Sequence, residues 1–166
     1  MDWSAVGALA ELAGAIGVIA TLGYLAAQVR HNTQAVRVQT YDSFVSQFRD
    51  WNAPMRADEN TALRWLEMIE RFESLDPKAR GHAVHVLYDF IRLAENLHYQ
   101  REQGLIEDLL WEGWENLFRA YLNSPAFHWY WERRRTFFSR DFGAWVDRLQ
   151  ADPDLAAPTA TRMVEG

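Results

Sequence analysis

The pair Glu95 and His98 is the most suggestive constellation in the chain, because residues three apart share one face of a helix. A Glu and a His at this spacing supply metal ligands in di-iron carboxylate bundles. Such a site requires a second Glu-x-x-His pair and two further inward carboxylates, and the sequence contains no second pair. We therefore expect no metal centre in this protein.

His98 is also a candidate binding residue on its own account. It lies at the centre of the apolar face of the helix expected over 77–104, and Glu95 lies at the edge of that face. One interpretation is a core histidine whose ring is satisfied by a hydrogen bond. The other is a pocket for a small apolar ligand, a lipid or a haem near His98, with Glu95 beside it. No motif names a specific cofactor, and none is predicted.

The segment 127–138 (FHWYWERRRTFF) joins an aromatic cluster to three consecutive arginines. One interpretation is structural: arginines near the end of a helix complement its exposed carbonyl groups, while the aromatic rings fill a small core. The sharper hypothesis is contact with anionic lipid at a membrane surface. The residues predicted to make that contact are Trp129, Trp131, Arg133, Arg134 and Arg135.

Composition excludes several classes of function. The chain contains no cysteine, so disulfides, thiolate zinc sites and a cysteine nucleophile are ruled out. A formal net charge of −6 argues against a general nucleic-acid binder. The phosphate-binding glycine-rich loop, the GxSxG elbow and the HExxH zinc motif are all absent from the sequence. Whether the protein is an enzyme stays open, but a non-catalytic role is favoured, since no nucleophile–base–orienter set can be assembled.

The elements that position these residues begin with an unusually apolar segment over 5–27. It carries one charged residue, Glu11, and its length reaches the roughly 20 residues that span a bilayer. A cleaved signal peptide and a buried helix of a soluble protein are the alternatives, but the first lacks its basic start. We predict a single-pass anchor in the cytoplasmic (inner) membrane. Arg30 and Arg37 follow the segment, which places the N-terminus outside and the domain in the cytoplasm.

One face of the predicted anchor carries small residues. At about 100° per residue, four of them with small-xxx-small spacing gather into a narrow stripe: Ala10, Gly14, Gly17 and Thr21. Small residues let two helix backbones approach closely in lipid. The stripe predicts a homo-oligomer that forms through the anchor, whereas the alternative is a lone anchor whose composition is merely Gly- and Ala-rich.

The rest of the chain predicts an all-α fold, because no run alternates with the period of a strand. One helix of about 50 residues can continue from the anchor to a stop at Pro54, with a bend near 31–33 as the alternative. Further helices are expected from 58 or 60 to 72, and then over 77–104, 106–122, 125–135 and 139–150. The predicted organisation is a transmembrane helix over 1–29, a cytoplasmic helical domain over 30–150 and a disordered tail over 151–166.

Several motifs resemble those of a family of uncharacterised bacterial proteins. The run Tyr24-Leu-Ala-Ala-Gln-Val-Arg-His-Asn-Thr33 is similar to that family's YLxxQ[IV]RxNT signature, and Glu95-Asn-Leu-His-Tyr-Gln100 and Trp111-x-x-Trp114 are similar to its second half. The resemblance implies a membrane-anchored helical protein and carries no activity or catalytic residue. The favoured function is therefore a scaffold or interaction module on a membrane, and a sensor or binding protein with its site near His98 is the alternative.

Overall fold

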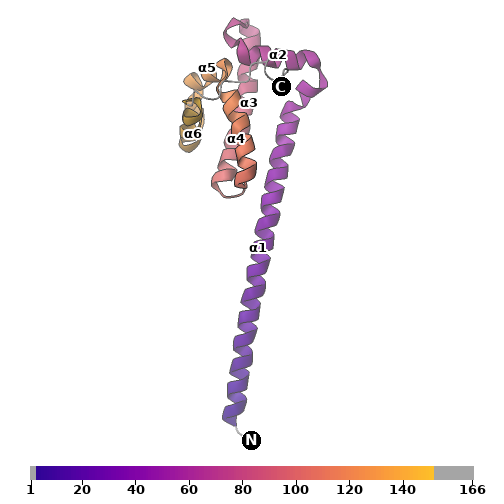
Figure 1. Cartoon of the computed structure of the whole chain (residues 1–166), viewed down its shortest axis with the longest axis vertical. Coiled ribbons are helices and arrows are strands. Elements are labelled where there is room, and N and C mark those ends of the chain that lie inside the picture. Colours follow the sequence, from indigo (N-terminus) through magenta and orange to yellow (C-terminus); the bar gives the residue numbers. More distant parts are fainter. Residues whose placement is uncertain (1–2, 152–166) are drawn as a thin grey trace. The chain divides into compact units, whose positions relative to one another are not determined.

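A computed structural model describes residues 3–151 of the chain, and these residues are helical with no strand among them. The all-α prediction is therefore confirmed. The α-helices are α1 (Trp3–Ala57), α2 (Glu59–Glu70), α3 (Pro77–Glu102), α4 (Asp108–Leu122), α5 (Pro125–Arg134) and α6 (Arg140–Gln150), with 3-10 turns η1 (Phe72–Ser74) and η2 (Arg135–Phe137) between them (Figure 1). The predicted tail lies almost wholly outside the described residues.

The chain divides into two units at Gln39 and Thr40, within α1. This division differs from the predicted domain boundary at 29. Helix α1 runs without a break through 31–33, where a bend was the alternative, and it also continues for one turn past Pro54. The predicted stop at Pro54 was therefore wrong by a few residues, because a proline interrupts only one hydrogen bond and the following turn can still form.

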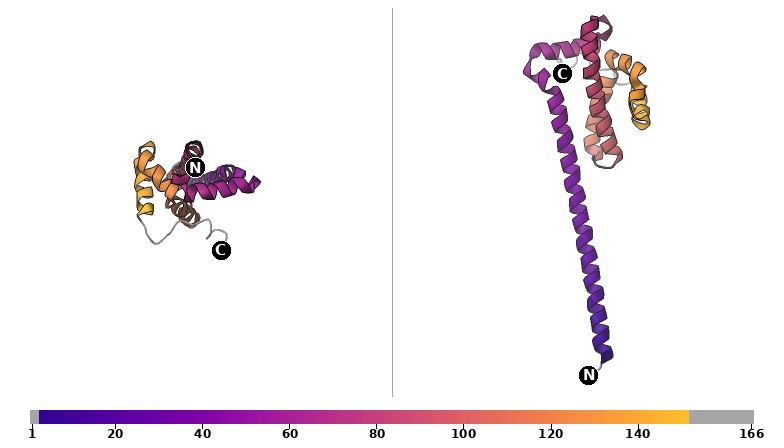
Figure 2. Two further views of the ribbon diagram at one scale, coloured as in Figure 1. Left: turned by 90° about the horizontal axis from the view of Figure 1, so that it is seen from above. Right: turned by 180° about the vertical axis from the view of Figure 1, so that it is seen from behind.

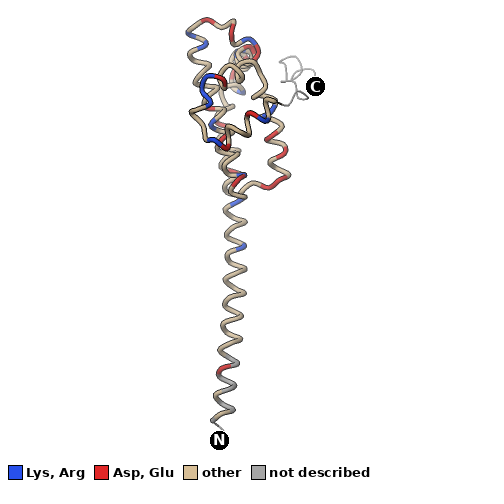
Figure 3. The backbone as a smooth tube through the Cα atoms, turned by 90° about the vertical axis from the view of Figure 1, so that its left-hand side faces the viewer, with Lys and Arg blue, Asp and Glu red and all other residues tan. Residues whose placement is uncertain are grey.

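The first unit is helical throughout its described part. Its side chains are described continuously from Gly14; those of Trp3, Ala5, Val6, Ala8, Leu9, Ala10, Leu12 and Ala13 are not among the described ones. No charged residue occurs from Leu12 to Val29, and Figure 3 shows this uncharged stretch in tan. Within the described residues, no helix combines the length and the apolarity that crossing a membrane requires.

The second unit is a bundle built around α3 and α4, which run in opposite directions and are joined by a tight turn (Figure 2). Gly104 forms the turn with a φ of 68°, a left-handed conformation that favours glycine. The amide of Leu105 donates to the carbonyl of Gln100 at 3.0 Å, which closes the end of α3 in a Schellman motif. Helix α5 packs against α2 and α3, and α6 packs against α3 and α4.

The core of this bundle is mainly aromatic. Phe90 of α3 is fully buried, and its ring lies 5.0–6.4 Å from five other rings: Trp51, Trp65, Phe118, Tyr121 and Phe127. These rings come from α1, α2, α4 and α5. One side chain therefore connects most of the helices of the unit, and tilted or edge-on pairs at these distances stabilise it beyond the area they bury.

Helix α4 does not present the face that its sequence predicts. The helical period of residues 106–122 predicts a buried side made of Leu110, Trp114, Leu117 and Tyr121, but the buried residues are Phe118 and Leu122. The reason is that α4 is contacted from two directions. Trp114 packs against Phe44 and Phe48 of α1, whereas Trp111 packs against Trp145 of α6. The most buried residues of α4 consequently lie between the side that packs on α1 and the side that packs on α6.

Candidate functional site

His98 lies in the core, as its position on α3 predicts, and only 7% of it is exposed. Its imidazole is surrounded by three aromatic rings, those of Trp111, Phe142 and Trp145, at centroid distances of 6.1, 5.7 and 5.1 Å. These rings come from α4 and α6. His98 therefore fills a gap between three helices of the bundle.

Burial lowers the pKa of His98 below its ordinary value of 6.5, because a desolvated imidazole disfavours the charged form. The carboxylates of Glu102, Asp141 and Glu115 oppose this shift, while Arg148 adds to it. The ring is consequently neutral at pH 7. A neutral imidazole can ligate haem iron, so the proposal of a ligand near His98 stays a prediction.

Glu95 contributes to the structure of the bundle rather than to a site at His98. One of its oxygens, Oε1, accepts a hydrogen bond of 2.7 Å from the backbone amide of Ser139, the N-cap residue of α6. The other, Oε2, forms an ion pair with Arg92. Arg92 in turn donates to the carbonyl oxygen of Phe137 at 2.8 Å. The two side chains thus hold α3 against the start of α6.

Glu95 and His98 make different contacts in the structure. Glu95 is engaged with η2 and α6, and His98 is enclosed by rings. In the part of the chain that the structure describes, no group of three His, Asp or Glu side chains is placed to hold a metal ion.

The five residues predicted to contact lipid do not form one exposed surface. Trp131 is buried and donates its indole hydrogen to Oδ1 of Asp147 at 2.8 Å. Arg135 binds the same carboxylate through two nitrogens, at 2.6 Å from Nη2 and 3.0 Å from Nε. The pairing lowers the pKa of Asp147, chiefly through the hydrogen bonds from Arg135. The placement of Trp131 in the core therefore does not favour its part in the lipid prediction.

Arg133 and Arg134 are each stacked on an aromatic ring of α5. The guanidinium carbon of Arg133 lies 4.5 Å from the centroid of Trp129, and that of Arg134 lies 5.6 Å from Tyr130. Trp129 also packs on Phe72 of η1 with a centroid distance of 4.6 Å. Such stacking is worth about 0.5–1 kcal/mol at an exposed site. These two arginines therefore already have a structural role within the bundle.

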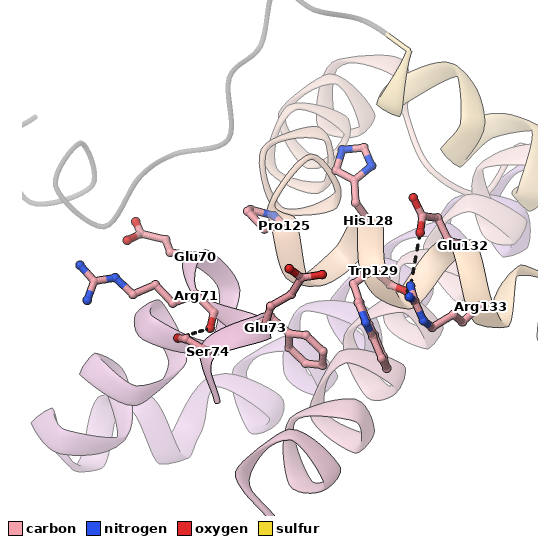
Figure 4. Close-up of a pocket in the computed structure, with 10 residues that line it drawn as sticks. Glu70, Arg71, Glu73, Ser74, Pro125, His128, Trp129, Glu132 and Arg133 are labelled. Atoms are coloured by element: carbon pink, nitrogen blue, oxygen red, sulfur yellow. Dashed lines mark hydrogen bonds and ion pairs between the residues drawn. The ribbon is translucent and has the colours of Figure 1, made fainter. Parts of the chain in front are cut away.

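Trp129 and Arg133 line a hollow of about 540 Å³ between η1 and α5 (Figure 4). Its other charged residues are Glu70, Arg71, Glu73 and Glu132. Glu132 forms an ion pair with Arg133 at 3.3 Å. Because acids outnumber arginines here, the hollow is less suited to an anionic headgroup than the run of arginines in the sequence indicates.

The predicted association face on α1 is open where the structure describes it. The side chain of Ala10 lies outside the described set. A methyl group placed on Gly14 or Gly17 would meet no atom within 4 Å. The hydroxyl of Thr21 donates to the carbonyl of Gly17 at 2.8 Å, so this polar group is satisfied within its own helix.

A larger cleft was not predicted from the sequence. It has a volume of about 990 Å³ and is lined by residues of the last turns of α1, of α2, of the turn after η1 and of the first half of α3. Periodicity marks Trp51 and Trp65 only as apolar residues of their helices. The sequence does place an acidic residue close to each tryptophan, Asp50 beside Trp51 and Glu67 two residues after Trp65. Only the fold brings these two pairs together in one cleft.

No known protein family, curated protein or solved structure matches this chain. The likeness of the Tyr24–Thr33 run to a family signature therefore stays a prediction.

Proposed function

We propose that this protein is a non-catalytic, membrane-anchored helical protein. The observation that carries the proposal is the exposure of the apolar side chains of α1. Ile16, Val18, Ile19, Leu22, Tyr24, Leu25 and Val29 are each 48–70% exposed. A helix that is apolar all round requires an apolar environment, since a contiguous exposed patch of this kind is rare on a free protein surface.

Lipid suits this helix better than a second protein surface does. The stretch from Leu12 to Val29 carries no charge, and the hydroxyl of Thr21 is already hydrogen-bonded within the helix. Satisfying polar groups internally is the main requirement that hydrocarbon places on a helix. Arg30 and Arg37 then lie on the cytoplasmic side, together with the bundle of residues 40–151.

The anchor's function, in this proposal, is to bring copies of the bundle together. Gly14, Gly17 and Thr21 provide a narrow face on which a second helix can approach closely. With its core aromatic and its histidine enclosed, the bundle serves as a scaffold or interaction module. A protein partner would bind to it at the membrane surface.

Topology can be tested directly because the chain has no native cysteine. Single cysteines would be introduced at Ser4 and at Gln103 in the full chain, and intact cells would be treated with a membrane-impermeant maleimide. We expect labelling at position 4 only, and retention of the protein in the carbonate-washed membrane pellet. Recovery in the supernatant, or labelling at position 103 before lysis, would contradict the proposal.

Association can be tested with three equivalent substitutions. Gly14→Leu and Gly17→Leu alter the small face, whereas Gly23→Leu places the same side chain roughly 180° from Gly14 on the helix. At all three positions an added Cβ atom meets no atom within 4 Å, so the three substitutions are matched in their local surroundings. Cross-linking of the detergent-solubilised protein should fall for the first two variants and not for the third. Equal cross-linking in all three would exclude association through this face.

A further inference from the structure

The cleft of about 990 Å³ in the bundle has aromatic and thioether walls. Trp51 of α1 and Trp65 of α2 meet nearly at right angles, with ring centroids 5.1 Å apart and an interplanar angle of 83°. Met55 and Met68 line the same space. Indole faces attract cations, and methionine side chains adapt their shape to the ligand. The walls therefore suit an apolar group that carries a positive charge.

The charges around the cleft are predominantly negative. Asp50, Glu67 and Asp89 line it, are exposed, and form no ion pair or side-chain hydrogen bond among the described residues. Asp76 also lines it, but its carboxylate accepts from the amides of Lys78 and Ala79 and so caps α3. Three carboxylates are thus free to meet a ligand.

Cationic side chains are nearly absent from the lining. Arg64 is the single Lys or Arg among the described residues that line the cleft. The summed field of the lining therefore attracts cations and repels anions. A carboxylate or phosphate ligand would be opposed at this position.

We infer that this cleft is a binding site for an organic cation, an amine or quaternary ammonium group attached to an apolar body. The apolar body lies against Met55 and Met68, and the charged head lies against the indole corner, within reach of the free carboxylates. Every residue involved belongs to the second unit, so the site is independent of the membrane anchor.

The test uses the full chain in a non-ionic detergent and titrates it by calorimetry with benzyltrimethylammonium. Benzyl alcohol and phenylacetate provide a neutral and an anionic molecule that keep the phenyl group. A cation–aromatic contact at a partly exposed site corresponds to an advantage of about threefold in Kd over the neutral molecule. Phenylacetate should bind most weakly, and added salt should weaken only the cation.

Two pairs of substitutions separate the site from the general charge of the protein. Asp50→Asn with Asp89→Asn should weaken binding of benzyltrimethylammonium about fivefold, as expected for two exposed charge interactions. Asp42→Asn with Glu112→Gln removes the same charge from exposed positions outside the cleft and should leave the Kd unchanged. Ala79→Phe, which fills part of the cleft from α3, should abolish binding without altering the melting temperature by more than a few degrees.

Four results would overturn the inference. They are failure of benzyltrimethylammonium to bind, an affinity for it no higher than for benzyl alcohol, an equal loss of affinity in the two charge pairs, and a preference for phenylacetate. Because the charge substitutions are at exposed positions, a loss of binding can be distinguished from a loss of folding by thermal denaturation of the same samples.

Discussion

Two regions of this chain are rich in apolar residues, which are exposed in one region and buried in the other. In the first unit, the described isoleucines and leucines (Ile16, Ile19, Leu22 and Leu25) are more than 40% exposed, whereas in the bundle the phenylalanines at 44, 90, 118, 127 and 142 are fully buried. The first region is aliphatic with small residues, and the second is aromatic. Hydrophobic content alone therefore does not say where a side chain will be buried; the partner surface available to it does.

The comparison also extends to polar contacts. The described hydrogen bonds of side chains in the first unit are local, such as that of Thr33 to the carbonyl of Val29. In the bundle, side chains bridge distant parts of the sequence, as Trp145 does by donating to Glu115 at 3.0 Å. The bundle has a specific tertiary structure, while the first unit is a helix whose described isoleucine and leucine side chains are exposed. The two regions should therefore respond differently to the same kinds of substitution.

The largest expected effect is on the aromatic core. Phe90→Ala should destabilise the bundle by about 3–5 kcal/mol, because it removes a ring that contacts four other helices and leaves a cavity. Leu22→Ala, in the exposed part of α1, should change the same unfolding free energy by less than about 0.5 kcal/mol. Urea unfolding of the full chain in detergent, followed by tryptophan fluorescence, measures both. Similar losses in the two variants would show that the regions are not distinct.

A smaller effect is expected from Glu95, which together with Arg92 holds α3 against the start of α6. Glu95→Ala removes the acceptor for the Ser139 amide and the partner of Arg92, which should cost about 1–3 kcal/mol because the carboxylate is largely buried. Hydrogen exchange at the Ser139 amide should accelerate more than exchange in α2. Glu112→Ala, at an exposed position of α4, is the control and should have little effect. Unchanged exchange at Ser139 would show that the carboxylate does not hold these two helices together.

The pH dependence of stability should come from the buried imidazole. Since the folded pKa of His98 lies below its unfolded value, the contribution to stability is complete above about pH 6.5 and is lost as pH falls toward the folded pKa. The unfolding free energy should therefore be lower at about pH 5.5 than at about pH 7.5. His98→Phe should reduce this difference. If the variant kept the full difference, protonation of His98 would not be its cause.

The elements of the fold were largely predictable from local signals. A helix was expected from Pro77 to Gly104, and the structure begins α3 at Pro77, with Asp76 as its N-cap, and places the turn at Gly104. Such signals depend on only a few neighbouring residues, so they can be identified from the sequence alone. The buried face predicted for α4 was wrong because two neighbours contact the helix, and neighbours are a property of the tertiary fold.

The candidate sites were less predictable for the same reason. His98 was expected in the core because its spacing from Leu87, Ile91 and Ala94 is helical. The role of Glu95 was missed, since its acceptor function involves an amide 44 residues away. The cleft was also missed, because its tryptophans come from different helices. Helical periodicity identifies which face of a helix is apolar, but it does not indicate which faces meet.

The smallest expected effect concerns the exposed pair of Arg135 and Asp147, and it completes the contrast between the regions. Arg135→Ala removes two charge-assisted hydrogen bonds, but both side chains are about half exposed, so water and salt compensate for most of their interaction. We expect a slight loss of stability at low ionic strength that disappears at high salt. Asp147 keeps its hydrogen bond from Trp131, so the core beneath should be unaffected. A loss that persists at high salt would mean that the arginine supports the bundle by packing over Gly143 rather than by charge, since its guanidinium group lies 3.4 Å from the position that a methyl group on this glycine would take.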